Sequence, residues 1–308
     1  MYVKLTRRNR MIIAAITVAV VAPLAALLAV EYARAAKEGK LFRVPASPLV
    51  IPLDRRLNVL IAVTMIAALA PYTAVVVMNA SYVSKIERDL PLFFRELAET
   101  VRSGVPLVRA VEEISARGAG PLRQEMRRVV FRSALGEPFE DSLRSFAERV
   151  DVYSTKVMSV ILSEAYASGA RVIDVLETAG DVYSMLLAFE LERRSKISPY
   201  AWTVYISLIL FLVISAALTE IFFKPLSSFA VGIPFMRGLL KPEVYETVFY
   251  YVSLMESFFG GLIVGKMRTG KVSRGLIHSI ILMAIAVTFY GAVLPLVSEL
   301  VSVPLPKT

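Results

Sequence analysis

The sequence predicts an all-α, polytopic membrane protein with five transmembrane helices and a cytoplasmic six-helix bundle built of three helical hairpins. Apolar residues make up 56% of its 308 residues and charged residues 20%, whereas soluble domains average about 45–50% and about 25%. Five runs of about 20 residues are nearly free of charge, which is the length that crosses ~30 Å of hydrocarbon. Between the second and third runs, apolar residues recur at helical spacing. This pattern disfavours a soluble enzyme and a disordered chain.

The predicted spans are residues 11–30, 57–80, 199–223, 245–264 and 276–297. The first run exceeds the 7–15 apolar residues of a signal peptide, so we expect a retained helix. Three domains follow from the spans: a two-span region (1–80), a charged helical domain (81–198) and a three-span region (199–308). The loop 31–56 contains Pro45, Pro48 and Pro52, which favour an extended, irregular connector.

The positions of Lys and Arg predict the orientation of the spans in a cell membrane. The net charge is +9, but acidic and basic residues nearly balance within 81–198, so the excess lies beside the spans. Basic residues are densest at 4–10 and 266–274, and such segments stay in the cytoplasm. The N-terminus and residues 81–198 are then cytoplasmic, while loop 31–56 and the C-terminus are external. The orientation of the spans therefore explains the excess of basic residues, and no nucleic-acid binding is predicted.

Residues 81–198 show helical periodicity throughout. Ile86, Leu90, Phe93, Leu97 and Val101 begin a stripe that needs a facing surface, and similar stripes follow, so a helical bundle is expected. Glycines recur at about 33-residue spacing, and Gly past a helix end adopts the left-handed conformation cheaply. The sequence therefore predicts turns of three hairpins at Gly104, Gly136 and Gly169.

The last of these helices, predicted at 171–196, meets Ser198-Pro199 and the third span directly. It is either a mechanical lever or a solvated collar whose charged side chains extend toward the membrane surface.

The order of spans and helices resembles a known family of membrane proteins. Residues 92–113 (LFFRELAETVRSGVPLVRAVEE) resemble the first helical hairpin of the type II secretion system F-domain family, and 162–177 (LSEAYASGARVIDVLE) resemble a later one. Residues 260–290 are similar to the last two spans of archaeal members, which include archaellum and pilus platform proteins. Many bacterial members have two such cytoplasmic domains and a compact Gly-Glu-x-x-Gly turn. This chain has one domain, and Glu164 precedes Gly169 by five residues.

The resemblance implies an assembly role without catalysis. It implies an inner-membrane platform that docks a cytoplasmic hexameric secretion ATPase and feeds pilin-like subunits of the membrane into a filament or pseudopilus. It also implies a homodimer or small homo-oligomer. Glu164, Arg171 and Asp174, around the Gly169 turn, are the candidate ATPase-facing residues, because a turn at the end of a bundle can present charge without disturbing the core. The alternative is an ordinary solvated turn.

Glu256 and His278 fall inside predicted spans, whereas Glu220 and Glu246 lie near span ends and are expected to be interfacial. Glu256 lies in the middle of the fourth span, where an ionisable group indicates function. It could pair with a polar group in an oligomer, pair with the amino end of a pilin-like helix, or be protonated and bonded to a neighbouring helix. His278, in the fifth span, is expected to be a structural residue bonded to a carbonyl or to Ser279. Gly260, Gly261 and Gly265 are expected to allow close helix contact.

The residue types exclude several kinds of site. The chain has no Cys and one His, so thiolate zinc sites, iron–sulfur clusters, disulfides and multi-histidine metal sites are excluded. The stretch 260–267 nearly matches a phosphate-binding loop but has Met267 where Ser or Thr should stand. No catalytic residue, metal or cofactor is predicted. A transporter or channel component with a cytoplasmic regulatory domain is the alternative function. An intramembrane aspartyl peptidase is disfavoured because the spans contain no Asp.

Overall fold

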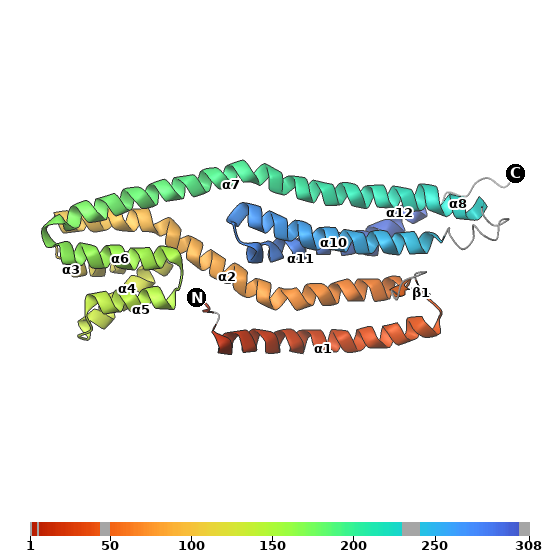
Figure 1. Cartoon of the computed structure of the whole chain (residues 1–308), viewed down its shortest axis with the longest axis horizontal. Coiled ribbons are helices and arrows are strands. Elements are labelled where there is room, and N and C mark those ends of the chain that lie inside the picture. The colour runs from red at the N-terminus through yellow and green to blue at the C-terminus, as the bar shows by residue number, and fades with distance from the viewer. Residues whose placement is uncertain (1, 5, 44–49, 230–240, 302–308) are drawn as a thin grey trace. The chain divides into compact units, whose positions relative to one another are not determined.

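The computed structural model describes residues 2–4, 6–43, 50–229 and 241–301 (Figure 1). These residues fall into two compact units. The charged unit comprises residues 2–10 and 75–196, and the apolar unit comprises residues 11–74 and 197–301. Pro45 and Pro48, predicted to lie in an irregular loop, are outside the described residues.

Within the described residues, five helices are long and apolar enough to cross a membrane, which confirms the five predicted spans by length and composition. They are the segments Arg7–Lys37, Arg55–Arg102, Val172–Ser227, Pro242–Thr269 and Val272–Glu299. The first is α1, the second is α2, and the fourth is α10. The third comprises α7 (Val172–Ala217), a π-helical turn at Leu218–Phe223 and the start of α8 (Lys224–Phe229). The fifth comprises a 3₁₀ turn (Val272–Gly275), α11 (Leu276–Thr288), a second π-helical turn (Phe289–Val293) and α12 (Leu294–Val301).

The charged unit is built around one apolar core. Four helices lie wholly within it: α3 (Leu107–Arg117), α4 (Pro121–Ala134), α5 (Phe139–Arg149) and α6 (Tyr153–Ser168). The end of α2 and the beginning of α7 complete the core. Its largest fully buried side chains include Phe93, Phe94, Phe146, Met126 and Leu162. All of these but Leu162 belong to the predicted stripes, so burial of one face of each helix accounts for the packing.

The predicted hairpins are not separate structural pairs. Along the chain, α3 packs on α4, α4 on α5, and α5 on α6. Gly104, Gly136 and Gly169 all have positive φ angles, of 95°, 96° and 54°, in the region that favours glycine. α3 and α4 are joined by Gly118–Gly120, where Gly120 also has a positive φ angle, of 135°.

Two long helices run from one unit into the other. α7 continues without a break through Pro199, as expected of a helix that feeds directly into a span. α2 is likewise continuous, whereas the sequence analysis placed a span and a bundle helix there separately. Residues 81–86 contain neither Gly nor Pro, so nothing in this segment ends the helix.

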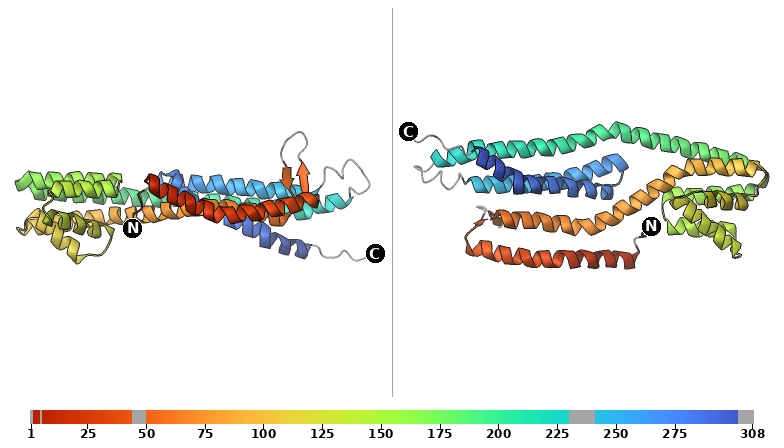
Figure 2. Two further views of the ribbon diagram at one scale, coloured as in Figure 1. Left: turned by 90° about the horizontal axis from the view of Figure 1, so that it is seen from below. Right: turned by 180° about the vertical axis from the view of Figure 1, so that it is seen from behind.

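The all-α prediction missed one small element between α1 and α2. Strands β1 (Leu41–Arg43) and β2 (Val50–Pro52) pair antiparallel, with Phe42 opposite Ile51 (Figure 2). Phe42, Val50 and Ile51 suit strands because aromatic and β-branched side chains pack well on a pleated surface. Three-residue strands are too short for a periodic signal, which is why an irregular loop was predicted.

A polar network ties the helices of the apolar unit together at the end near β2. Asn58 is buried, and its side-chain amide donates to the carbonyl of Pro52 at 2.9 Å. Its side-chain oxygen accepts from the Tyr251 hydroxyl at 2.8 Å, and its backbone carbonyl accepts from Tyr250 at 3.1 Å. Arg55 donates to the carbonyl of Tyr290. α2, α10 and the last apolar helix are therefore joined by bonds that a nonpolar environment strengthens.

Candidate partner-binding site

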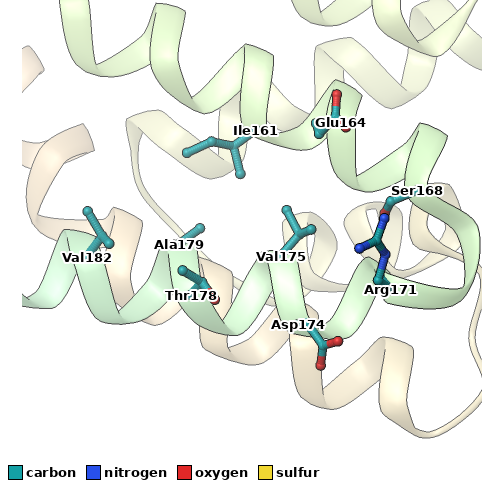
Figure 3. A pocket seen from close by; sticks show the side chains of 9 residues that line it. All are labelled: Ile161, Glu164, Ser168, Arg171, Asp174, Val175, Thr178, Ala179 and Val182. Carbon is teal, nitrogen blue, oxygen red and sulfur yellow. The ribbon is translucent and has the colours of Figure 1, made fainter.

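The three candidate ATPase-facing residues line one open pocket at the junction of α6 and α7. Its volume is about 570 Å³. Figure 3 shows the side chains that α6 and α7 present to it: Ile161, Glu164, Ser168, Arg171, Asp174, Val175, Thr178, Ala179 and Val182. We call this the α6–α7 groove. Sequence patterns indicate Glu164, Arg171 and Asp174 as candidates but carry no signal of the cavity.

The turn at Gly169 shapes the groove. A short 3₁₀ segment, Gly169–Arg171, joins the two helices. The N–H of Val172 donates to the carbonyl of Gly169 and closes this turn. Because Leu162 and Leu176 are buried in the core, the neighbouring positions on each helix are left to line the groove.

The groove combines an apolar floor with charges at the end near the turn. Ile161 and Val175 are partly buried, whereas Glu164, Arg171 and Asp174 are exposed. In Figure 3, Arg171 rises from the turn toward α6, and the carboxylate of Asp174 is directed away from α6. Within the described part of the chain, none of these three charges takes part in an ion pair. The site can therefore accept an apolar side chain and offer both signs of charge to a partner.

A second groove lies on the other side of α6 and was not predicted. Its volume is about 650 Å³, and α5 and α6 line it. Its charged residues are Glu140, Asp141, Arg144, Glu148, Lys156 and Glu164. Glu164 therefore lines both grooves. The acidic pair at the start of α5 was the available signal, but sequence spacing could not place it beside α6.

The predicted glycine contacts lie between α10 and the start of the last apolar helix. A Cβ added at Gly261 would overlap the backbone of Ser279, and one at Gly265 would overlap Gly275. At Gly260 the nearest atom would be the Val204 Cγ1, 2.9 Å away. The stretch 260–267 is therefore part of a helix packed on its neighbour (Figure 2), not a loop that could cradle a phosphate.

The two polar residues of the apolar unit bond to different positions on α7. The Ser207 hydroxyl donates to Glu256 Oε1 at 3.1 Å. His278 Nδ1 lies 2.6 Å from the Tyr205 hydroxyl. The expected partners of His278 were wrong, since Ser279 donates instead to the carbonyl of Phe258. Tyr205 is 73 residues from His278 in the chain, so local spacing could not reveal it.

Comparison with known proteins supports the resemblance seen in the sequence. Residues 93–219 match the family model described as type II secretion system (T2SS), protein F. The match confirms the resemblance to this family. The matched residues, called the protein F segment below, include both grooves and continue along α7.

One curated relative and the solved structures complete the comparison. The chain is 24% identical over 199 residues to a protein of Methanocaldococcus jannaschii described as uncharacterized protein MJ1286. The alignment covers 65% of this chain but 32% of that protein, so the chain spans about a third of its length. No solved structure matches the chain.

A buried carboxylate inside the protein F segment was not predicted. Glu125 of α4 is 2% exposed. It accepts hydrogen bonds from the Tyr82 hydroxyl at 3.0 Å and from Arg128 at 2.6 Å, and its other oxygen lies 2.8 Å from Arg149 Nη2. A buried charge persists only when it is paired in this way. This cluster joins α2, α4 and the end of α5, and it has a structural role.

The N-terminal residues attach to the charged unit next to the protein F segment. The side-chain amide of Asn79 accepts from the Val3 N–H and donates to the Val3 carbonyl, both at 2.8 Å. Lys4 donates to the carbonyl of Glu148 at 2.8 Å and lies 3.8 Å from Asp151. The hydrogen bond and charge of Lys156, 2.7 Å away, lower the pKa of Asp151, and Lys4 adds to this effect. We call residues 2–4 the N-terminal strap.

Proposed function

We propose that this protein is a membrane platform for assembly of a type IV pilus-like filament or a secretion pseudopilus. It couples a cytoplasmic hexameric ATPase to the insertion of pilin-like subunits. The observation that carries the proposal is the protein F match at 93–219, which includes an exposed helical surface and the helix that leaves it for an apolar segment. The five apolar helices support a membrane location.

In this proposal the α6–α7 groove is the ATPase-binding site. An apolar side chain of the ATPase occupies the groove between Ile161 and Val175, while Arg171 and its acidic neighbours fix the orientation. Apolar anchors surrounded by charge are typical of protein interfaces. α7 begins at this groove and continues as one helix into the apolar unit, so a displacement at its start can reach the membrane segment.

The platform performs no chemistry of its own in this proposal. ATP hydrolysis by the partner supplies the free energy, and the helical bundle transmits it. The N-terminus and the charged unit lie in the cytoplasm, and the C-terminus lies outside. The protein acts as a homodimer or small homo-oligomer, so each ATPase ring contacts more than one charged unit.

Binding of the full-length protein to an ATPase tests the proposal. The protein is placed in lipid nanodiscs, and its affinity for purified hexameric secretion ATPases is measured by biolayer interferometry. We expect Arg171→Glu to weaken binding at least about tenfold, because reversing a charge at an interface removes an attraction and adds a repulsion.

Arg109→Glu is the matched control for this charge reversal. Arg109 is exposed on α3, where it pairs with Glu112 of the same helix, and it lines neither groove. Equal loss of binding in both variants would contradict the groove as the docking site. Absence of binding to every ATPase tested, together with solute flux through the protein in liposomes, would replace the platform with a transporter or channel component.

A further inference from the structure

Glu256 is the one Asp, Glu, Lys or Arg in the middle of a predicted span. The spans 11–30, 57–80, 199–223, 245–264 and 276–297 otherwise contain only Glu220 and Glu246, each within three residues of a span end. α10 extends from Pro242 to Thr269, so Glu256 is 14 residues from one end and 13 from the other. At 1.5 Å per residue, the carboxylate lies about 20 Å along the helix from either end. It therefore lies near the middle of a membrane-length helix.

The Glu256 side chain lies on an exposed apolar surface. Its neighbours along α10 are Val252, Met255 and Phe259, which are 42%, 61% and 55% exposed. α7, which supplies Ser207, also exposes Ile206 and Leu210. We call these α10 residues, together with Ile206, Ser207 and Leu210, the Glu256 face. Ser207 is the hydrogen-bond partner of the carboxylate among the described residues.

Two other carboxylates of the three-span region, Glu220 and Glu246, have cationic partners within the apolar unit. Glu220 is buried and accepts from Lys224 through both oxygens, at 2.6 Å each. Glu246 lies 3.9 Å from Arg55. Within the described residues, no Lys, Arg or His approaches Glu256 as an ion-pair partner. A carboxylate facing hydrocarbon is costly and marks a site where a partner is needed.

We propose that the Glu256 face binds a transmembrane helix of another polypeptide that carries an ammonium group at mid-membrane depth. Charge complementarity selects this partner, because the Glu256 carboxylate is an acidic hydrogen-bond acceptor surrounded by apolar side chains. A second copy of this chain is disfavoured, since symmetric contact would bring two carboxylates together. The inference rests on the proposed function only in naming a membrane subunit as the partner.

Model peptides test this inference in a defined membrane. The full-length protein is labelled with a fluorophore at Lys271→Cys, which is a unique thiol because the chain has no Cys. It is reconstituted in phosphatidylcholine vesicles with single-span Leu/Ala peptides that carry a central Lys, Gln or Glu and an acceptor dye. We expect the Lys peptide to bind at least about tenfold more tightly than the Gln peptide by energy transfer, which corresponds to about 1.4 kcal/mol.

Two variants test whether Glu256, and not a general effect of the membrane, causes the preference for the Lys peptide. Glu256→Gln should abolish the preference for Lys, and Glu256→Lys should transfer the preference to the Glu peptide. Glu243→Gln, near the end of α10, is the matched control and should keep the preference for Lys. A preference that survives in Glu256→Gln, or equal binding of Lys and Gln peptides, would overturn the inference.

A third measurement addresses self-association. Energy transfer between two labelled copies of the chain that is lost in Glu256→Gln, without any peptide preference, would assign the face to a second copy and overturn the inference. None of these readouts involves an ATPase. Failure of ATPase binding would therefore leave this result unchanged, and failure here would leave the platform proposal standing.

Discussion

At the scale of single residues, glycines decide how closely the apolar helices approach. Gly261 and Gly265 lie where a Cβ would overlap the backbone of the neighbouring segment, whereas Gly291 has open space around its Cβ position. All three residues are glycines, so only their surroundings in the fold distinguish them. Small-residue spacing predicts that the first two are helix-packing residues, but it carries no signal that Ser279 and Gly275 are their contacts.

We expect Gly261→Ala to lower the free energy of unfolding by about 1–3 kcal/mol, because an added methyl group forces the two helices apart. Gly291→Ala is the control, and we expect it to be neutral or stabilising, since Ala favours a helix by about 1 kcal/mol over Gly. Thermal unfolding of the full-length protein in detergent, followed by circular dichroism, measures both. Equal stability of the two variants would show that close packing at Gly261 is not needed.

At the scale of elements, periodicity predicts the helices. It does not predict the short strands or the contacts between residues that are far apart in the chain. The stripes of residues 81–198 marked the core correctly because each buried face repeats over several turns. The strands at Leu41–Arg43 and Val50–Pro52 have too few residues to repeat. The strap bond between Val3 and Asn79 spans 76 positions, and the Tyr82–Glu125 bond spans 43. Folding brings such residues together, and their spacing in the chain carries no signal of it.

The N-terminal strap should respond to acid through Asp151. Its pKa in the folded protein is held below the usual value of 3.8 by Lys156 and Lys4. A lowered pKa stabilises the folded arrangement at pH values above the usual one, and this contribution disappears as the pH falls through the lowered pKa. Lys156 has the larger effect on this pKa, and Lys4 alone belongs to the strap. We therefore expect protonation of Asp151 below about pH 4 to weaken the strap's attachment by the Lys4 contact only.

Amide hydrogen exchange at Val3 measures strap attachment, because its N–H donates to Asn79. The full-length protein is compared with Asp151→Asn at each pH, so that the intrinsic pH dependence of exchange cancels. We expect faster exchange at Val3 in the variant at neutral pH and convergence of the two proteins in acid. Asp141→Asn, on the exposed start of α5, is the control. An acid response of the same size in Asp151→Asn would assign the loosening to another group.

At the scale of the whole molecule, the arrangement of charge predicts which parts face the cytoplasm. The proposed function requires the charged unit there, because an ATPase ring needs access to the α6–α7 groove. The same reasoning places the β1–β2 segment outside. Since the chain lacks Cys, single cysteines report these positions without background. Ser103→Cys, Lys271→Cys and Lys37→Cys are suitable because all three positions are exposed.

We expect a membrane-impermeant maleimide to label Lys37→Cys in intact cells, and to label Ser103→Cys and Lys271→Cys after permeabilisation. Each basic residue near a membrane surface favours the cytoplasmic side, and Lys271 lies in the densest group of them. The cysteine-free parent protein is the control for background labelling. If Ser103→Cys reacts in intact cells, the charged unit lies outside. The groove would then have no access to ATP-driven partners, and the platform proposal would fail on topology alone, whatever the family match.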